Sequence, residues 1–309
     1  MQLKVRTRTI LLILLCAPTF LHGCQSEHQV PVAPPKTLAD VVEEVSTSIV
    51  RVELSISYQV RAATSPESVQ SETMSSWSSG TGFVIDDKGH IATAHHVVDI
   101  NSIRAQLQAG IAAKGLVILP GSEAESLSVV VPVPDVNGDE HNNVFYDVAE
   151  HHPAQLLVED NKLDISILNC NDNLLTWTSP NRYNGRPLTS KRTLPKFQTS
   201  QPHSGDAVFI SGFPAVLESQ NIKVQIPGLT TNSGIVSKPF FLDEFGRSVL
   251  LLDIHATHGD SGGPVFNAND GSVIGFVDRG LPTVDGGDSG LTAIVPISQI
   301  LGLLQNAKR

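Results

Sequence analysis

Short apolar runs of strand length recur along most of this 309-residue chain, separated by Gly, Pro and Asn/Asp turn signals. The sequence Asn-Asp-Gly at residues 269–271 stands between two such runs and favours a hairpin turn. Many short strands at this spacing are typical of barrels and sandwiches. We therefore expect an all-β fold. Examples of the runs are Gly82–Ile85, Ile165–Leu168, Ala207–Ile210, Val249–Asp253 and Val273–Phe276.

Helical patterns stand at the two ends of this β-rich region. A capping-box-like start at Thr37 and apolar residues at helical spacing predict a short helix to about Val45. From Ile49 apolar and polar residues alternate, which predicts a strand. The Ser-rich residues 64–80 predict a loop, and residues 298–307 predict a closing helix.

Composition excludes several classes of protein. Hydrophobic residues make up 40% of the chain and charged residues 17%, which suffices for a core and excludes disorder for its bulk. The formal net charge is −10, whereas proteins that bind nucleic acid usually present positive charge to the phosphates, so we expect no nucleic-acid partner. Three cysteines cannot form a disulfide framework.

The N-terminus has the layout of a secretory signal peptide. A basic segment precedes a mostly apolar stretch over residues 10–21 that is too short to span a bilayer comfortably. Residues 21–24, Leu-His-Gly-Cys, resemble the lipobox of bacterial lipoproteins. That resemblance implies that Cys24 is lipidated and that the exported protein is anchored in the cell envelope, at the outer membrane if the host is Gram-negative. The alternative is an ordinary signal peptide whose cysteine is incidental.

The sequence Gly-Asp-Ser-Gly-Gly-Pro at residues 259–264 is the most informative motif. Attack on an acyl carbonyl needs an exposed hydroxyl on a tight turn, with backbone N–H groups aimed at the developing oxyanion. Glycine lets the backbone turn and approach a substrate closely. We predict that Ser261 is a nucleophile and that the N–H groups of Gly259 and Ser261 form an oxyanion hole.

Residues 287–290 repeat the Gly-Asp-Ser-Gly part of this motif. The second copy lacks the following Gly-Pro and lies in a polar, Gly-rich stretch, whereas the first lies between two apolar runs. We therefore interpret Ser289 as a loop residue.

A serine nucleophile needs a base, and Thr-Ala-His-His at residues 93–96 supplies two candidates. Both His95 and His96 can titrate near neutral pH, so chemistry alone leaves the choice open. The pattern Thr-Ala-x-His favours His96. The alternative for either histidine is a polar residue at the end of a strand.

A buried carboxylate must then orient the imidazole. Asp164 opens an alternating apolar strand, where an unpaired carboxylate would be costly, so we predict it as the third member. Asp135, Asp139 and Asp147 lie in more polar stretches and are interpreted as solvated.

Together these segments resemble chymotrypsin-type serine proteases, with the chain order His, Asp, Ser. The resemblance is closest to the HtrA/DegP-like branch and covers roughly residues 37–305. It rests also on Gly80–Ile85, Gly205–Pro214, Ser233–Ser237 and Ala293–Ile297. It implies two packed six-stranded antiparallel β-barrels with a short N-terminal and a C-terminal helix, a triad in the cleft between them, and peptide hydrolysis through an acyl-enzyme.

The resemblance also implies a division of the chain. We expect a signal peptide over residues 1–24, a flexible tether over 25–36, a helix and first barrel over 37–195, and a second barrel with the closing helix over 196–309. Residues 105–160 are interpreted as holding an insertion in the first barrel. We expect no PDZ domain, and relatives in this branch are often trimers, which implies a homo-oligomer.

The resemblance places a substrate pocket around His255, Ala256, Phe276 and Val277. No acid stands where trypsin-like enzymes bind Arg or Lys substrates, because His255 occupies that position. We expect small or aliphatic P1 residues, with acidic ones as the alternative. Adjacent His pairs rarely converge on one ion, so we expect neither a metal nor another cofactor.

The sequence thus predicts an exported, lipid-anchored serine endopeptidase that acts on polypeptides of the cell envelope. The alternative is a catalytically silent barrel of the same fold that serves as a peptide-binding module.

Overall fold

A computed structural model describes residues 36–64, 71–132, 149–177, 182–183, 186–187, 192–214 and 229–307. They belong to one compact unit, Lys36–Arg309. The expected signal peptide, Cys24 and nearly all of the tether lie outside the described residues, as do Asp135, Asp139 and Asp147. None of the described helices is both long and apolar enough to cross a membrane.

The first half of this unit is a closed β-barrel. Its neighbouring strands run antiparallel in the order β2-β3-β7-β6-β5-β1, and pairing of β1 with β2 closes the ring. A short seventh strand, β4 (Leu116–Ile118), pairs with the far end of β1. The barrel strands are β1 (Ile49–Ala62), β2 (Glu72–Val84), β3 (Ile91–Ala94), β5 (Ala124–Pro132), β6 (Ala149–Asp160) and β7 (Ile165–Cys170).

The second half is a second closed antiparallel barrel with the order β10-β11-β12-β15-β14-β13. The expected turn between β13 and β14 includes residues 268–270, and the N–H of Gly271 closes it by donating to the carbonyl of Asn267 at 2.9 Å. A separate ribbon joins β8 (Arg182–Tyr183) to β9 (Arg186–Pro187). The expectation of two six-stranded antiparallel barrels is confirmed. The strands are β10 (Ala207–Gly212), β11 (Thr230–Leu242), β12 (Ser248–Asp253), β13 (Pro264–Asn267), β14 (Val273–Pro282) and β15 (Asp288–Pro296).

Helices stand at both ends of the described chain, as expected. Helix α1 (Leu38–Ser46) begins with a capping box, in which Thr37 Oγ1 accepts from the N–H of Asp40 while the Asp40 carboxylate accepts from the N–H of Thr37. Helix α4 (Ile297–Ala307) closes the fold. Val41 of α1 and Ile300 of α4 belong to the largest apolar cluster.

That cluster joins the two barrels. It contains Phe83 and Ile167 of the first barrel together with Phe209 and Phe266 of the second, whose rings stack with centroids 5.0 Å apart. A smaller cluster, which includes Leu252, fills the second barrel. Because both barrels and both end helices bury side chains against one another, the junction between the barrels is fixed by packing.

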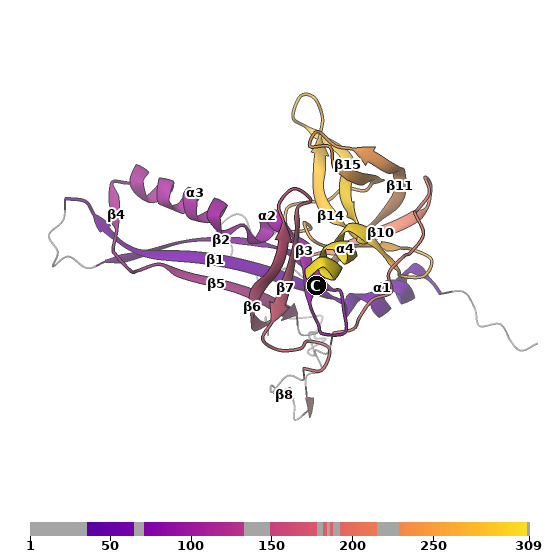
Figure 1. The fold of residues 1–309 in the computed structure, drawn as a ribbon, viewed down its shortest axis with the longest axis horizontal. Coiled ribbons are helices and arrows are strands. Elements are labelled where there is room, and N and C mark those ends of the chain that lie inside the picture. Colours follow the sequence, from indigo (N-terminus) through magenta and orange to yellow (C-terminus); the bar gives the residue numbers. More distant parts are fainter. Residues whose placement is uncertain are drawn as a thin grey trace, which may run out of the picture. The chain divides into compact units, whose positions relative to one another are not determined.

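The sequence-based expectation of a loop over residues 64–80 was wrong for most of that range. Residues 72–80 belong to β2, which pairs with β1 from Ile49–Phe83 to Val60–Glu72. The apolar side of this hairpin is covered by α3 (Ile100–Ala113), which buries Ile103, Leu107 and Ile111 against Leu54, Ile56 and Tyr58 (Figure 1). Backbone pairing with β1 and cover from α3 outweigh the weak strand preference of serine.

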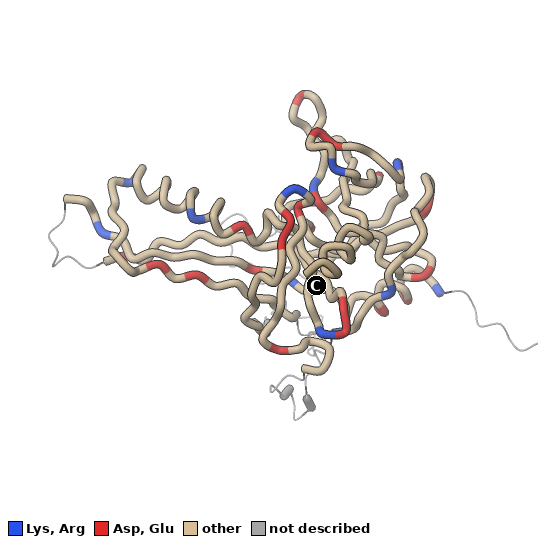
Figure 2. Tube along the Cα trace, viewed as in Figure 1, with Lys and Arg blue, Asp and Glu red and all other residues tan. Residues whose placement is uncertain are grey.

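The range 105–160, predicted to hold an insertion, includes strands β5 and β6, which are members of the barrel. Among its described residues, most of α3 and the strand β4 are additions to the six-stranded ring, and residues 133–148 lie outside the described residues. Figure 2 shows Lys and Arg dispersed over the described trace rather than gathered in one stripe.

Candidate active site

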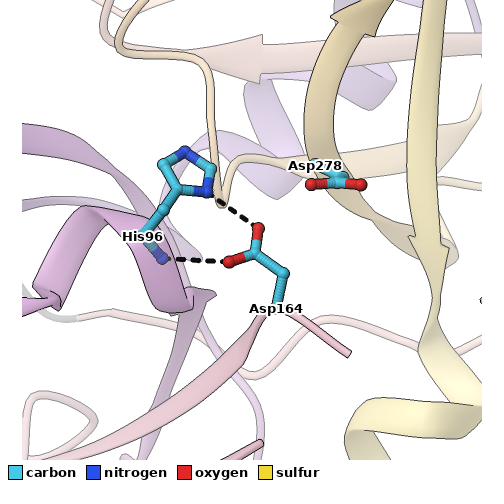
Figure 3. Close-up of side chains that lie close together, drawn as sticks. All are labelled: His96, Asp164 and Asp278. Atoms are coloured by element: carbon cyan, nitrogen blue, oxygen red, sulfur yellow. Dashed lines mark hydrogen bonds and ion pairs between the residues drawn. The ribbon is translucent and has the colours of Figure 1, made fainter. Parts of the chain in front are cut away.

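Two predicted residues of the first barrel, His96 and Asp164, are in direct contact (Figure 3). The Asp164 Oδ2 atom lies 2.8 Å from His96 Nδ1, and Asp164 Oδ1 accepts from the backbone N–H of His96 at 3.0 Å. Asp164 stands between β6 and β7 with a φ of 58°. Aspartate adopts this left-handed conformation more readily than most residues, which suits it to this position.

The short helix α2 (His95–Val98) follows β3 directly and separates the two adjacent histidines. His95 Nδ1 lies 3.3 Å from Ser166 Oγ and 3.1 Å from Glu159 Oε2. The side chain of His96 is half exposed, whereas that of His95 is largely buried. Binding of Nδ1 by Asp164 leaves the Nε2 atom of His96 facing away from the carboxylate (Figure 3). The structure thereby distinguishes two histidines that chemistry left equivalent.

The contact changes the acidity of both groups. Desolvation by itself lowers the pKa of His96, but the hydrogen bond and charge of Asp164 outweigh it and raise this pKa above its ordinary value. Desolvation raises the pKa of Asp164, but the hydrogen bond and charge of His96 hold it below its ordinary value. The pair therefore favours a carboxylate beside an imidazole that is readily protonated.

Ser261 lies on a tight turn that only glycine permits. Gly259 and Gly262 have φ values of 94° and 80°. A Cβ atom at Gly262 would lie 2.2 Å from the carbonyl oxygen of Thr81 and 2.4 Å from Thr93 Oγ1. The turn is therefore pressed against the first barrel, which explains the glycine after the serine.

Thr81 of β2 joins that turn to the first barrel. Its N–H donates to the carbonyl of Ser261 at 2.9 Å, and its Oγ1 donates to the carbonyl of Gly259 at 2.7 Å. The same Oγ1 accepts from the N–H of Phe213 at 3.0 Å, and the side chain is fully buried. One residue of the first barrel thus holds two carbonyls of the Ser261 turn.

The two Gly-Asp-Ser-Gly copies differ in their surroundings. Ser261 Oγ is partly buried and donates to the carbonyl of Asp278 at 3.3 Å. Ser289 lies at the start of β15 instead of in the expected loop, and its Oγ donates to the carbonyl of Leu281 across the β14–β15 hairpin. Ser261 therefore stands at the junction of the barrels, whereas Ser289 serves a hairpin.

The sequence of residues 80–276 matches the model of the trypsin-like peptidase domain family. This match covers more than half of the chain. The chain belongs to this family. No curated protein matches its sequence.

In this trypsin-like peptidase Asp260 is held within its own loop. It is almost fully buried, and its Oδ2 accepts from the N–H of Thr257 at 2.8 Å and from Thr257 Oγ1 at 3.0 Å. Burial raises the pKa of Asp260 above its ordinary value, and the hydrogen bonds from Thr257, which lower this pKa, offset the effect of burial only in part. The carboxylate thus fastens the segment that immediately precedes Ser261.

Sequence reasoning missed Asp278 of β14, which lies beside the His96–Asp164 pair in the structure. Ligand-type atoms of the three side chains all lie within 4.8 Å of one another (Figure 3). Asp278 is 2% exposed. Its position directly after the apolar run of β14 was a usable signal, because a carboxylate there is costly unless partnered.

These three side chains are an unfavourable site for a cation. Asp278 Oδ2 already accepts from Arg247 Nη2 at 2.6 Å and from Arg279 Nη1 at 3.1 Å. Asp164 is engaged by His96. Two guanidinium groups next to the cluster would repel a metal ion, so the arrangement suits proton sharing better than metal binding.

The predicted pocket residues fall into two groups. His255 is exposed and pairs with Asp288, and Ala256 is partly buried against the core of the second barrel. Phe276 and Val277 are buried within the two apolar clusters. That all four line a substrate pocket stays a prediction.

Proposed function

We propose that this trypsin-like peptidase is a serine endopeptidase with Ser261 as nucleophile, His96 as general base and Asp164 as the carboxylate that orients the base. The observation that carries the proposal is the double contact of Asp164 with the backbone N–H and Nδ1 of His96. A carboxylate on Nδ1 places the proton there, which leaves Nε2 as the acceptor that a base requires.

The proposed chemistry follows from these roles. Ser261 Oγ attacks the carbonyl of a peptide bond while His96 Nε2 removes its proton, and the N–H groups of Gly259 and Ser261 stabilise the oxyanion. His96 then protonates the leaving amine, and an acyl group remains on Ser261. Water activated by His96 hydrolyses this ester. The raised pKa of His96 favours the imidazolium that forms in each step.

A specific observation favours a second candidate, a silent or latent barrel that binds peptides without cleaving them. Ser261 Oγ donates to the carbonyl of Asp278. Catalysis requires this hydroxyl to leave that carbonyl and reach His96, a rearrangement that substrate binding supplies in many enzymes.

A fluorophosphonate probe separates the two candidates, because it labels an activated serine irreversibly. We expect labelling of the wild-type chain and of the matched control Ser289→Ala, and none of Ser261→Ala. Failure of the folded wild-type protein to react across pH 5 to 9, with retained binding of unfolded polypeptide, would instead establish the binding module.

The cellular role is proposed from the sequence. The lipobox-like residues 21–24 support an exported protein anchored by lipid on Cys24, and the HtrA-like motifs support action on unfolded envelope polypeptides by a homo-oligomer. Metabolic labelling with a fatty-acid analogue tests the anchor, with Cys24→Ser as the variant that loses label and membrane association. Cleavage of a peptide library tests the expected small or aliphatic P1 preference. A dominant preference for Asp or Glu would assign the pocket to His255.

A further inference from the structure

Asp278, a residue of the second barrel, lies beside all three proposed catalytic residues. His96 and Asp164 both belong to the first barrel, whereas Asp278 lies on β14. Its backbone carbonyl accepts from Ser261 Oγ, and one oxygen of its carboxyl group lies within 4.8 Å of a ring nitrogen of His96 and of a carboxylate oxygen of Asp164 (Figure 3). One residue therefore meets all three members of the proposed triad.

Asp278 is also the end of an ion network that begins at the β11–β12 turn. Arg247, 8% exposed, donates from Nε to Asp243 at 2.6 Å and from Nη2 to Asp278 at 2.6 Å. Arg279 binds Asp278, Asp243 and Glu244. The groups that face the Asp278 carboxyl are thus two guanidinium groups of the second barrel and the His96–Asp164 pair of the first.

We propose that Asp278 is a positioning residue of this site, whose carboxyl group supports the Asp164 carboxylate and couples the Arg247–Arg279 network to His96. This inference rests on the proposed peptidase function. Burial and the charge of Asp164 raise the pKa of Asp278 to about 6, against the two guanidinium groups. Below this pH its carboxyl O–H donates to Asp164 and helps to keep Asp164 ionised. Above it the proton passes to solvent, and a second negative charge faces the imidazole of His96.

Because Asp278 can be charged or neutral, the proposal predicts the direction in which substitutions shift the pKa of His96. The charge of Asp278 raises the pKa of His96, whereas the charge of Arg279 lowers it. Asp278→Asn keeps the size and a hydrogen-bond donor for Asp164 but removes the charge. It must therefore lower the pKa of His96, whereas Arg279→Gln must raise it. A purely structural role for Asp278 predicts neither shift.

The first test needs no catalysis. Nitrogen-15 NMR follows the titration of His96 in full-length protein carrying Ser261→Ala, alone and combined with Asp278→Asn, Arg279→Gln or the control Asp87→Asn, whose exposed side chain lies in the turn after β2. Relative to Ser261→Ala alone, we expect the pKa of His96 to fall with Asp278→Asn, to rise with Arg279→Gln and to stay unchanged with Asp87→Asn. An unchanged His96 titration in folded Asp278→Asn overturns the proposal. If that variant does not fold, an unchanged titration in Arg279→Gln overturns it.

The second test uses the rate of fluorophosphonate labelling and of peptide cleavage against pH. In Asp278→Asn the acidic limb of both profiles is expected at lower pH, with a several-fold fall in kcat on the plateau and little change in KM. Unchanged profiles count against the inference. An inactive wild type refutes the proposed peptidase function alone, because the titration of His96 still decides the role of Asp278.

Discussion

The N–H of Thr81 donates to the carbonyl of Ser261 at 2.9 Å, and this bond joins strand β2 of the first barrel to the Gly-rich turn of the second. The hydroxyl of the same threonine binds the Gly259 carbonyl and the N–H of Phe213. The proposed nucleophile and the proposed base lie on different barrels, so their separation depends on contacts of this kind.

Replacement of Thr81 by valine should weaken that junction. Thr81→Val keeps the shape but leaves the N–H of Phe213 and the carbonyl of Gly259 without their hydroxyl partner in a buried place. We expect a loss of about 1–3 kcal/mol in the free energy of unfolding, measured by urea denaturation, and slower fluorophosphonate labelling. Thr81→Ser retains the hydroxyl and should preserve the labelling rate. Equal behaviour of the two variants would contradict a hydrogen-bonding role.

Asp164→Asn should separate catalysis from folding. An amide N–H toward His96 Nδ1 imposes the wrong tautomer, so we expect kcat for peptide cleavage to fall by roughly 10⁴-fold. Asparagine tolerates the left-handed backbone at this position, whereas alanine does not. The free energy of unfolding of Asp164→Ala should therefore be about 1 kcal/mol lower than that of Asp164→Asn. Thermal unfolding of both variants checks this order, and the reverse order would show that φ at this position is not strained.

The two copies of Gly-Asp-Ser-Gly offer a matched pair of glycines. Gly262 and Gly290 both have positive φ, but only a Cβ atom at Gly262 meets other atoms, while nothing lies within 4 Å of one at Gly290. Gly290→Ala should cost about 1 kcal/mol from backbone strain alone. Gly262→Ala should cost several times more or prevent folding. Yields and denaturation midpoints measure the difference, and similar midpoints would refute the close approach to Thr81.

Stability should depend on pH through Asp278. Its pKa of about 6 in the folded protein lies above the ordinary value of 3.8, so the folded state holds this proton more tightly than the unfolded state. The contribution of Asp278 to stability therefore falls as pH rises from about 4 to about 6, and it is constant above. Asp278→Asn removes this loss. The free energy of unfolding of Asp278→Asn, measured relative to that of wild type, should therefore increase between pH 4 and pH 6 by at most roughly 3 kcal/mol.

Denaturation of both proteins from pH 4 to pH 7 tests this expectation. Asp87→Asn, an exposed substitution of the same kind, should show a difference from wild type that does not vary with pH. A flat difference for Asp278→Asn as well would mean that Arg247 and Arg279 fully offset the burial of Asp278.

Local patterns were sufficient to predict an all-β fold, whereas the two six-stranded barrels were expected from the resemblance to chymotrypsin-type proteases. Alternation and turn residues act over a few neighbours, so short strands such as β7 and β10 could be read directly. The Ser-rich part of β2 could not, because its pairing with β1 and its cover by Ile103, Leu107 and Ile111 come from segments that the local pattern does not contain. The expected loop failed for that reason.

The residue types of the proposed site were determined by the sequence alone: a serine between glycines, two adjacent histidines and an aspartate at the start of an apolar strand. The pattern Thr-Ala-x-His favoured His96, but only the tertiary structure showed that this histidine meets Asp164, and only it brought Asp278 and its two arginines to the same place. The physical reason is that hydrogen bonds and charges act through space over a few ångströms. Partners far apart along the chain, such as Asp164 and Asp278, become neighbours only when the two barrels pack.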